Sequence, residues 1–223
     1  MTKDLFVQAI FKFVLGVAVV GLLLFLPAGT MQYWNAWLLM GILFVPMFFA
    51  GIIMMFKNPE LLKKRLQAKE KQVEQKLVIK LSGFMFILGF VSAGLNVRYG
   101  WISLPDWVSW AAAVFFLFAY LLYAEVLREN IYLSRTIEVQ ENQSVIDTGL
   151  YGIVRHPMYA ATVLLFLSIP LVLGSLLSLV IFLVYPFIIA KRIRNEEDVL
   201  EQELEGYVAY QQKVKYKLIP FIW

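Results

Sequence analysis

Nine polar side chains in the second half of the chain are of types that bind small charged molecules. Carboxylates hold a ribose diol or an ammonium group, an arginine fork matches a carboxylate, and aromatic rings attract a sulfonium. Together these groups suit a small zwitterionic ligand held against a lipid substrate. The alternative is that the charges only cap the ends of helices. The nine residues are Glu125, Arg128, Gln140, Arg155, His156, Tyr159, Arg192, Glu196 and Glu197.

Several familiar catalytic patterns are missing from the sequence. There is no cysteine and only one histidine, His156, which argues against thiolate sites and histidine-based zinc sites. No dinucleotide-binding, P-loop or nucleophile-elbow motif occurs. Transporters usually carry ionisable residues in the middle of their membrane spans. Here Lys12 and Glu125 lie near the ends of apolar stretches, which weakens the case for a transport function.

The elements that must position these residues are membrane helices. Apolar residues make up 61% of the 223 residues, against about 45–50% in soluble domains. We expect an all-α, multi-pass transmembrane bundle of about six helices, in which the short fifth and sixth form a tight hairpin at Gly174, kinked at Pro170 and Pro186. The expected spans are residues 6–28, 34–56, 81–97, 107–124, 157–173 and 175–190.

The basic residues predict the orientation of this bundle. Of the 20 Lys and Arg residues, 19 fall in segments that share one side of the membrane if all six helices cross, Arg98 being the exception. Because basic residues favour the cytoplasmic side, we expect both termini and the polar cluster to be cytosolic. The membrane would be the plasma or inner membrane in a prokaryote and the endoplasmic reticulum in a eukaryote.

Three segments on that side differ in pattern. Residues 57–80 are rich in lysine and predict either a helix on the membrane surface or an ordinary topology-fixing loop. Residues 128–156, the connector, include a stretch with an extended pattern at 136–140 and a turn at 148–149. In the tail, a stripe of Leu200, Leu204, Tyr207 and Val208 suits the membrane surface, and residues 218–223 suit an interfacial anchor.

Two motifs in the second half are similar to those of a known family. Residues 149–159 match the pattern G-x-Y-x-x-x-R-H-P-x-Y of isoprenylcysteine carboxyl methyltransferases and their prokaryotic relatives, and residues 192–200 match their R-x-x-x-E-E-x-x-L element. Residues 125–128, Tyr207, Tyr210 and residues 219–221 also fit the family pattern. The resemblance covers roughly residues 107–223, whereas residues 1–106 match only as membrane helices. We expect these two regions to form a single structural domain.

The resemblance implies a pocket for S-adenosylmethionine and a role for each matching residue. The family's substrate-side arginine falls on Arg192, which would hold the acceptor, and Arg155 and Glu197 would complete the catalytic group. For Arg155, orienting the turn and binding a phosphate-like group both stay open. The residues implied in cofactor binding are Gln140, Gln143, Ser144, Val145, Ile146, Tyr151, His156, Pro157, Met158, Tyr159 and Glu196.

The reaction implied is methyl transfer to a lipid-like or prenylated acceptor, through a carboxylate. A carboxylate needs no base at neutral pH, whereas an amine would need one, for which Glu197 and His156 are candidates. The alternatives are a phospholipid or other amphiphile methyltransferase on the same fold, a related reductase, and a non-catalytic assembly or transport protein. Neither a metal nor a nucleic acid is expected as a partner.

Overall fold

The structure is a computed structural model, and it describes residues 3–66, 73–133, 137 and 139–223. All regular secondary structure of the described residues is helical, and these residues contain no β-sheet. The helices are α1 (Lys3–Ala28), α2 (Trp34–Lys57), α3 (Pro59–Leu66), α4 (Val73–Tyr99), α5 (Asp106–Glu129), the 3-10 turn η1 (Gly149–Gly152), α6 (Pro157–Val172), α7 (Leu176–Phe182), α8 (Tyr185–Glu203) and α9 (Tyr207–Lys213).

The described helices confirm a multi-pass membrane bundle. Five apolar segments are long enough to cross a membrane, and α6 is a shorter apolar helix. Their outer faces carry side chains that a water-soluble surface would not tolerate at this density, such as Leu26, Phe56 and Phe187, which are 74%, 76% and 76% exposed. The protein is therefore an integral membrane protein.

The predicted hairpin at Gly174 is present, with one difference in its second arm. Gly174 has a φ of +68°, a left-handed conformation that glycine adopts without steric cost. The span predicted for residues 175–190 is divided, because α7 ends at Phe182 and α8 begins at Tyr185. Pro186 occupies the first turn of α8, where its missing N–H costs no hydrogen bond. Pro170 lies inside α6 without ending it.

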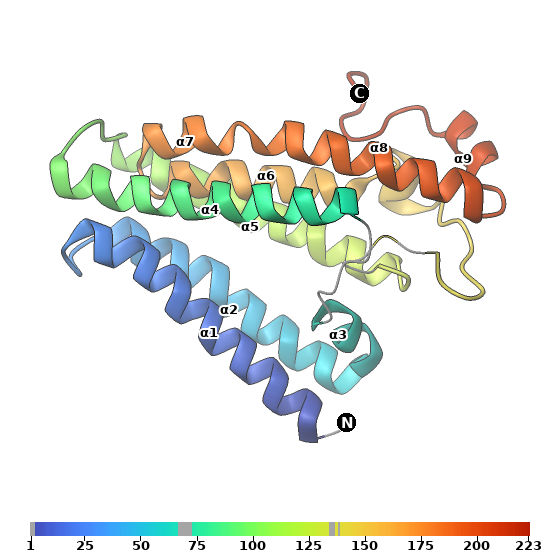
Figure 1. Ribbon diagram of the computed structural model, residues 1–223, viewed down its shortest axis with the longest axis horizontal. Coiled ribbons are helices and arrows are strands. Elements are labelled where there is room, and N and C mark those ends of the chain that lie inside the picture. The colour runs from blue at the N-terminus through green and yellow to red at the C-terminus, as the bar shows by residue number, and fades with distance from the viewer. Residues whose placement is uncertain (1–2, 67–72, 134–136, 138) are drawn as a thin grey trace.

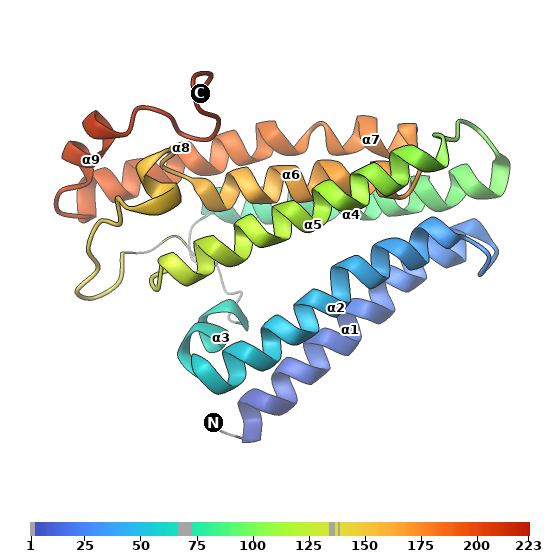
Figure 2. The ribbon, with the colours of Figure 1, turned by 180° about the vertical axis from the view of Figure 1, so that it is seen from behind.

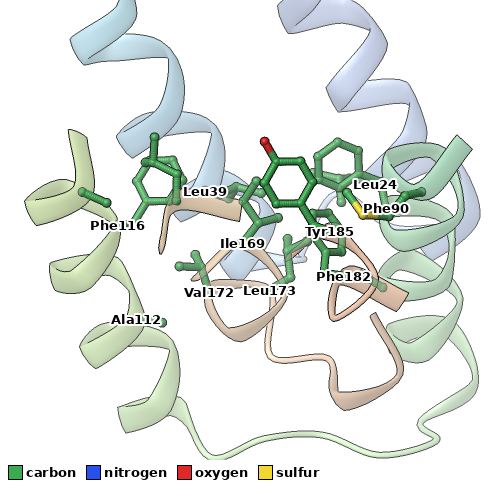
Figure 3. Close-up of a cluster of buried hydrophobic side chains, with 14 of the residues drawn as sticks. Leu24, Leu39, Phe90, Ala112, Phe116, Ile169, Val172, Leu173, Phe182 and Tyr185 are labelled. Carbon is green, nitrogen blue, oxygen red and sulfur yellow. The ribbon is translucent and has the colours of Figure 1, made fainter. Parts of the chain in front are cut away.

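A continuous hydrophobic core joins the helices. It includes Leu24 of α1, Leu39 of α2, Phe116 of α5, Ile169 of α6 and Phe182 of α7 (Figure 3). Because α6 packs against α5, α7 and α8, its residues are among the most enclosed of the bundle. The first turn of α6 is thereby held in a fixed position.

One end of the bundle, which we call the basic end, gathers residues 57–66, the described residues of 129–156 and residues 203–223 (Figure 1). Both views show the α1–α2 hairpin close to the other helices at the opposite end and diverging from them toward the basic end, with α3 beside the divergence (Figures 1 and 2). Residues 57–80, for which the sequence left a surface helix and an ordinary loop open, are divided between α3 and the start of α4, and residues 67–72 lie outside the described part. Leu61 and Leu62 are buried in protein.

Candidate functional site

A cavity lies at the basic end, between the first turn of α6, the middle of α8, the connector and the tail. It encloses about 850 Å³ of space, open solvent at its mouth included. Its wall combines aromatic rings, aliphatic side chains and a few polar groups, which is the composition of small-molecule sites. The lining residues are Asn130, Tyr132, Leu133, Ile137, Gln143, Ser144, Val145, Ile146, Tyr151, Arg155, His156, Met158, Tyr159, Arg192, Glu196, Leu200, Leu204, Tyr207 and Tyr210.

The turn that leads into α6 depends on Gly149. This residue has a φ of +50°, and a Cβ placed on it would lie 2.2 Å from Oε1 of Glu129. The Glu129 carboxylate accepts hydrogen bonds from the Thr148 hydroxyl at 2.9 Å and from the Leu150 amide at 3.2 Å. Glu129, the last residue of α5, therefore fixes η1 and with it Tyr151, one wall of the cavity.

One tyrosine hydroxyl links the two charged residues that α8 presents to the cavity. Arg192 and Glu196 are four residues apart and share a face of the helix. Arg192 Nε donates to the Tyr159 hydroxyl at 2.8 Å, and the same hydroxyl donates to the Glu196 carboxylate. The Arg192 guanidinium also lies 5.8 Å from the centre of the Tyr159 ring. Tyr159 thus sets the spacing between a cationic and an anionic group on one wall.

Glu197 points away from the cavity into a buried ionic cluster. Its carboxylate accepts from Arg155 Nε at 2.8 Å, lies 3.1 Å from His156 Nε2, and accepts from Lys217 Nζ. Glu197 is 3% exposed and does not line the cavity. An ion this deeply buried is tolerated because three cationic or hydrogen-bonding groups surround it. The cluster holds the R-H-P turn against α8.

Arg155 and His156 also hold the C-terminal tail. Arg155 Nη1 donates to the carbonyl oxygens of Val214 and Lys215, at 2.8 Å and 2.9 Å. The backbone amides of Arg155 and His156 donate to the carbonyls of Tyr216 and Lys217, each at 2.9 Å. His156 occupies the N-cap position of α6, but its side chain makes no capping hydrogen bond and lies against Glu197 instead.

The tail stripe predicted for the membrane surface closes the cavity instead. Leu204, Tyr207 and Tyr210 are buried and pack with Val145 and Leu200, whereas Val208 is 51% exposed. The Tyr210 hydroxyl donates to the Tyr151 carbonyl at 2.7 Å. Burial raises the pKa of Tyr207 and Tyr210 well above the usual value for a phenol, so both stay protonated.

The Tyr207 hydroxyl is buried in this wall without a hydrogen-bond partner among the described residues. A buried polar atom of this kind costs free energy unless something satisfies it. It therefore marks a place where a polar group of a ligand would be stabilised.

Most of the residues proposed from the sequence lie together. Gln143, Ser144, Val145, Ile146, Tyr151, His156, Met158, Tyr159, Glu196, Arg155 and Arg192 line the cavity, whereas Gln140, Pro157 and Glu197 do not. Glu125 and Arg128 of the initial polar cluster pair with each other on α5, 2.5 Å apart and partly exposed. Four lining residues that follow α5 belong to no motif and were not predicted: Asn130, Tyr132, Leu133 and Ile137. Leu200 and Leu204 were expected on the membrane surface but line the cavity.

Fold and site together define an integral membrane protein with a small-molecule cavity at one end of its helical bundle. Among the described residues, no group of three or more His, Cys, Asp or Glu side chains is placed to hold a metal ion.

Residues 107–202 match the model of the isoprenylcysteine carboxyl methyltransferase family, so this region of the chain belongs to that family. This match indicates membrane methyltransferase activity. A comparison with curated proteins finds no match for the chain.

Proposed function

We propose that this protein transfers a methyl group from S-adenosylmethionine to a carboxylate of a lipid-like or prenylated acceptor, at the cytosolic edge of the membrane. The observation that carries the proposal is the linked trio of Arg192, Tyr159 and Glu196 on the wall of a cavity at the end of an apolar bundle. A cation for the acceptor and an anion for the cofactor stand side by side there.

The residues of the cavity fit the proposed cofactor. Its α-ammonium and ribose hydroxyls need carboxylate or amide partners, for which Glu196 and the connector residues Gln143 and Ser144 are available. The unpartnered Tyr207 hydroxyl offers one more donor. The rings of Tyr151 and Tyr159 suit a sulfonium by cation–π attraction. When bound, the cofactor supplies an electrophilic methyl group.

Arg192 would orient the acceptor by pairing its planar guanidinium with the carboxylate. An acceptor carboxylate has a pKa of about 4 and is already a nucleophile at neutral pH. The protein's contribution is then to hold the reacting groups in line and to exclude water. Two features agree with a reaction that needs no base. Glu197 is bound by Arg155, His156 and Lys217, and it does not line the cavity.

The distribution of basic residues supports the proposed orientation. With the basic end in the cytosol, the lysine-rich segments obey the preference of basic residues for that side. The cofactor would then enter from the cytosol, and the acceptor's apolar tail would stay in the bilayer.

Binding of S-adenosylhomocysteine to the detergent-purified full chain tests the cofactor site. Isothermal titration should give micromolar affinity for the wild type and for Asp198→Asn, an exposed carboxylate on the same helix, and at least a ten-fold loss for Glu196→Gln. Absence of binding by a folded, monodisperse wild type would contradict the proposal and favour a non-catalytic membrane protein.

A radiolabelled methyl-transfer assay then tests the acceptor. A farnesylated cysteine with a free carboxylate should be methylated, whereas its carboxamide should not. Arg192→Ala should reduce kcat far more than it weakens S-adenosylhomocysteine binding, and equal losses in both would contradict the role given to Arg192. Methylation of phospholipid amines in place of the carboxylate would establish the alternative acceptor.

A further inference from the structure

Helix α3, which lies outside the region that matches the family, touches the connector. Lys64 Nζ donates to Oε1 of Gln140 at 2.6 Å. The same short helix is held by two other elements, because Lys12 Nζ of α1 donates to the Leu66 carbonyl at 2.5 Å and the Arg65 guanidinium lies 5.4 Å from the centre of the Tyr123 ring on α5. Lys64 therefore reaches the connector from a fixed base.

Gln140 connects Lys64 to the cavity wall through its own hydrogen bonds. It does not itself line the cavity, but its side-chain amide donates to the Tyr132 carbonyl at 2.5 Å. Its backbone amide donates to Gln143 Oε1 at 2.9 Å, and the Gln143 amide donates back to the Gln140 carbonyl at 3.0 Å. Tyr132 and Gln143 both line the cavity, so one glutamine joins two wall residues that are eleven positions apart in the sequence.

The described connector residues between α5 and η1 form no helix or strand. Without a backbone ladder, the shape of this wall depends on side-chain bonds. A hydrogen bond from an ammonium group is stronger than one between neutral groups. The Lys64–Gln140 bond is therefore well suited to fix the connector from outside.

We propose that Lys64 is a positioning residue for the cofactor cavity, acting through Gln140 on the connector wall that contains Tyr132 and Gln143. Gln140 is then a relay and not a cofactor ligand, which revises the role that the resemblance implied for it. The inference rests on the proposed function, because it assumes that the cavity binds S-adenosylmethionine.

The direct test compares Lys64→Met with Lys63→Met. Lys63 is the exposed neighbour on the same helix. The control substitution therefore removes the same charge and leaves a side chain of similar length. Lys64→Met should raise the Kd for S-adenosylhomocysteine and the KM for S-adenosylmethionine about ten-fold, the loss expected for one charge-assisted hydrogen bond, and leave kcat within about two-fold. Lys63→Met should match the wild type. Equal behaviour of the two variants would overturn the proposal.

A charge-exchange pair separates positioning from a general loss of fold. Lys64→Glu and Gln140→Lys should each weaken binding, and the double variant should recover most of it, because a lysine at position 140 can donate both to a glutamate at position 64 and to the Tyr132 carbonyl. A double variant as weak as the worse single one, in a folded sample, would overturn the relay.

Hydrogen exchange without ligand keeps this test independent of the proposed function. Amides of residues 139–147 should exchange faster in Lys64→Met than in Lys63→Met, whether or not the wild type binds the cofactor. Faster exchange without wild-type binding would refute the proposed function and leave the contact between α3 and the connector established. Unchanged exchange would refute the positioning role itself.

Discussion

Tyr159→Phe removes the single hydroxyl that links Arg192 to Glu196. The ring stays, and with it the contacts to His156 and to the Arg192 guanidinium, each 5.8 Å from the ring centre. The hydroxyl accepts from Arg192 Nε at 2.8 Å and donates to the Glu196 carboxylate. A hydrogen bond to a charged group contributes about 1.5–3 kcal/mol. Arg192 and Glu196 are only half-buried, so water can replace part of the two lost hydrogen bonds. We therefore expect a net loss of about 2 kcal/mol.

A loss of about 2 kcal/mol corresponds to roughly a thirty-fold fall in kcat/KM for the acceptor. We expect S-adenosylhomocysteine affinity to fall less, about three- to five-fold, because Glu196 can still meet the cofactor while Arg192 loses its alignment. Methyl-transfer kinetics and calorimetry in detergent measure the two quantities.

Tyr216→Phe is the matched control, since the Tyr216 ring packs against Phe221 in the tail and does not line the cavity. In an Arg192→Ala background the further effect of Tyr159→Phe should shrink, as expected for coupled residues. Unchanged kcat/KM in a folded Tyr159→Phe sample would refute the functional link between Arg192 and Glu196.

Four further predictions concern the surroundings of the cavity. Glu197→Gln should reduce the free energy of unfolding by about 3 kcal/mol, because it leaves buried cationic groups uncompensated. The apparent melting temperature should fall accordingly. Gly149→Ala should cost about 1–3 kcal/mol through its positive φ and its clash with Glu129, and a thermal shift with unchanged ligand affinity would contradict a role in shaping the cavity. Tyr207→Phe should leave the ligand-free protein as stable or more stable, since its hydroxyl is unsatisfied, yet weaken S-adenosylhomocysteine binding in titrations. Burial raises the pKa of Tyr210, so its contribution to stability should be full below pH 10 and decline as the pH rises above that value, which thermal unfolding across pH 8–11 can measure.

The sequence was sufficient for the helices because lipid imposes a simple rule. Charge-free stretches of about 20 residues cross the membrane, and the predicted span at 34–56 agrees with α2 to within one residue at each end. The last predicted span, residues 175–190, lies apart from its first residue within the apolar segment Leu176–Glu203, but hydropathy did not show the short break between α7 and α8. Helix α4 also extends beyond its predicted span, because its first turns carry polar residues that hydropathy does not count as membrane.

The cavity was only partly predictable, because an apolar stripe on a helix does not say what covers it. Leu204 and Tyr207 have the spacing expected of a helix on a membrane surface, yet they pack on Val145 of the connector. Tyr132 and Gln140 lie in a stretch without regular structure, so no periodicity shows which side chain faces the ligand and which one supports the wall. The resemblance implied Gln140 as a cofactor ligand, whereas in the structure Gln140 does not line the cavity.

The functional unit extends beyond the region that matches the family, in both directions. The matched region, residues 107–202, contains Arg155, Glu197 and the connector. Two contributing residues follow this region: Lys217, which completes the Glu197 cluster, and Tyr207 in the cavity wall. Lys64 precedes it. A fragment of residues 107–202 should therefore not bind S-adenosylhomocysteine. A chain divided at residue 102, at the opposite end from the cavity, should bind it when residues 1–102 and 103–223 are produced together, because the division leaves every contact of the cavity in place. Binding by the short fragment alone would show that α3 and the tail are dispensable.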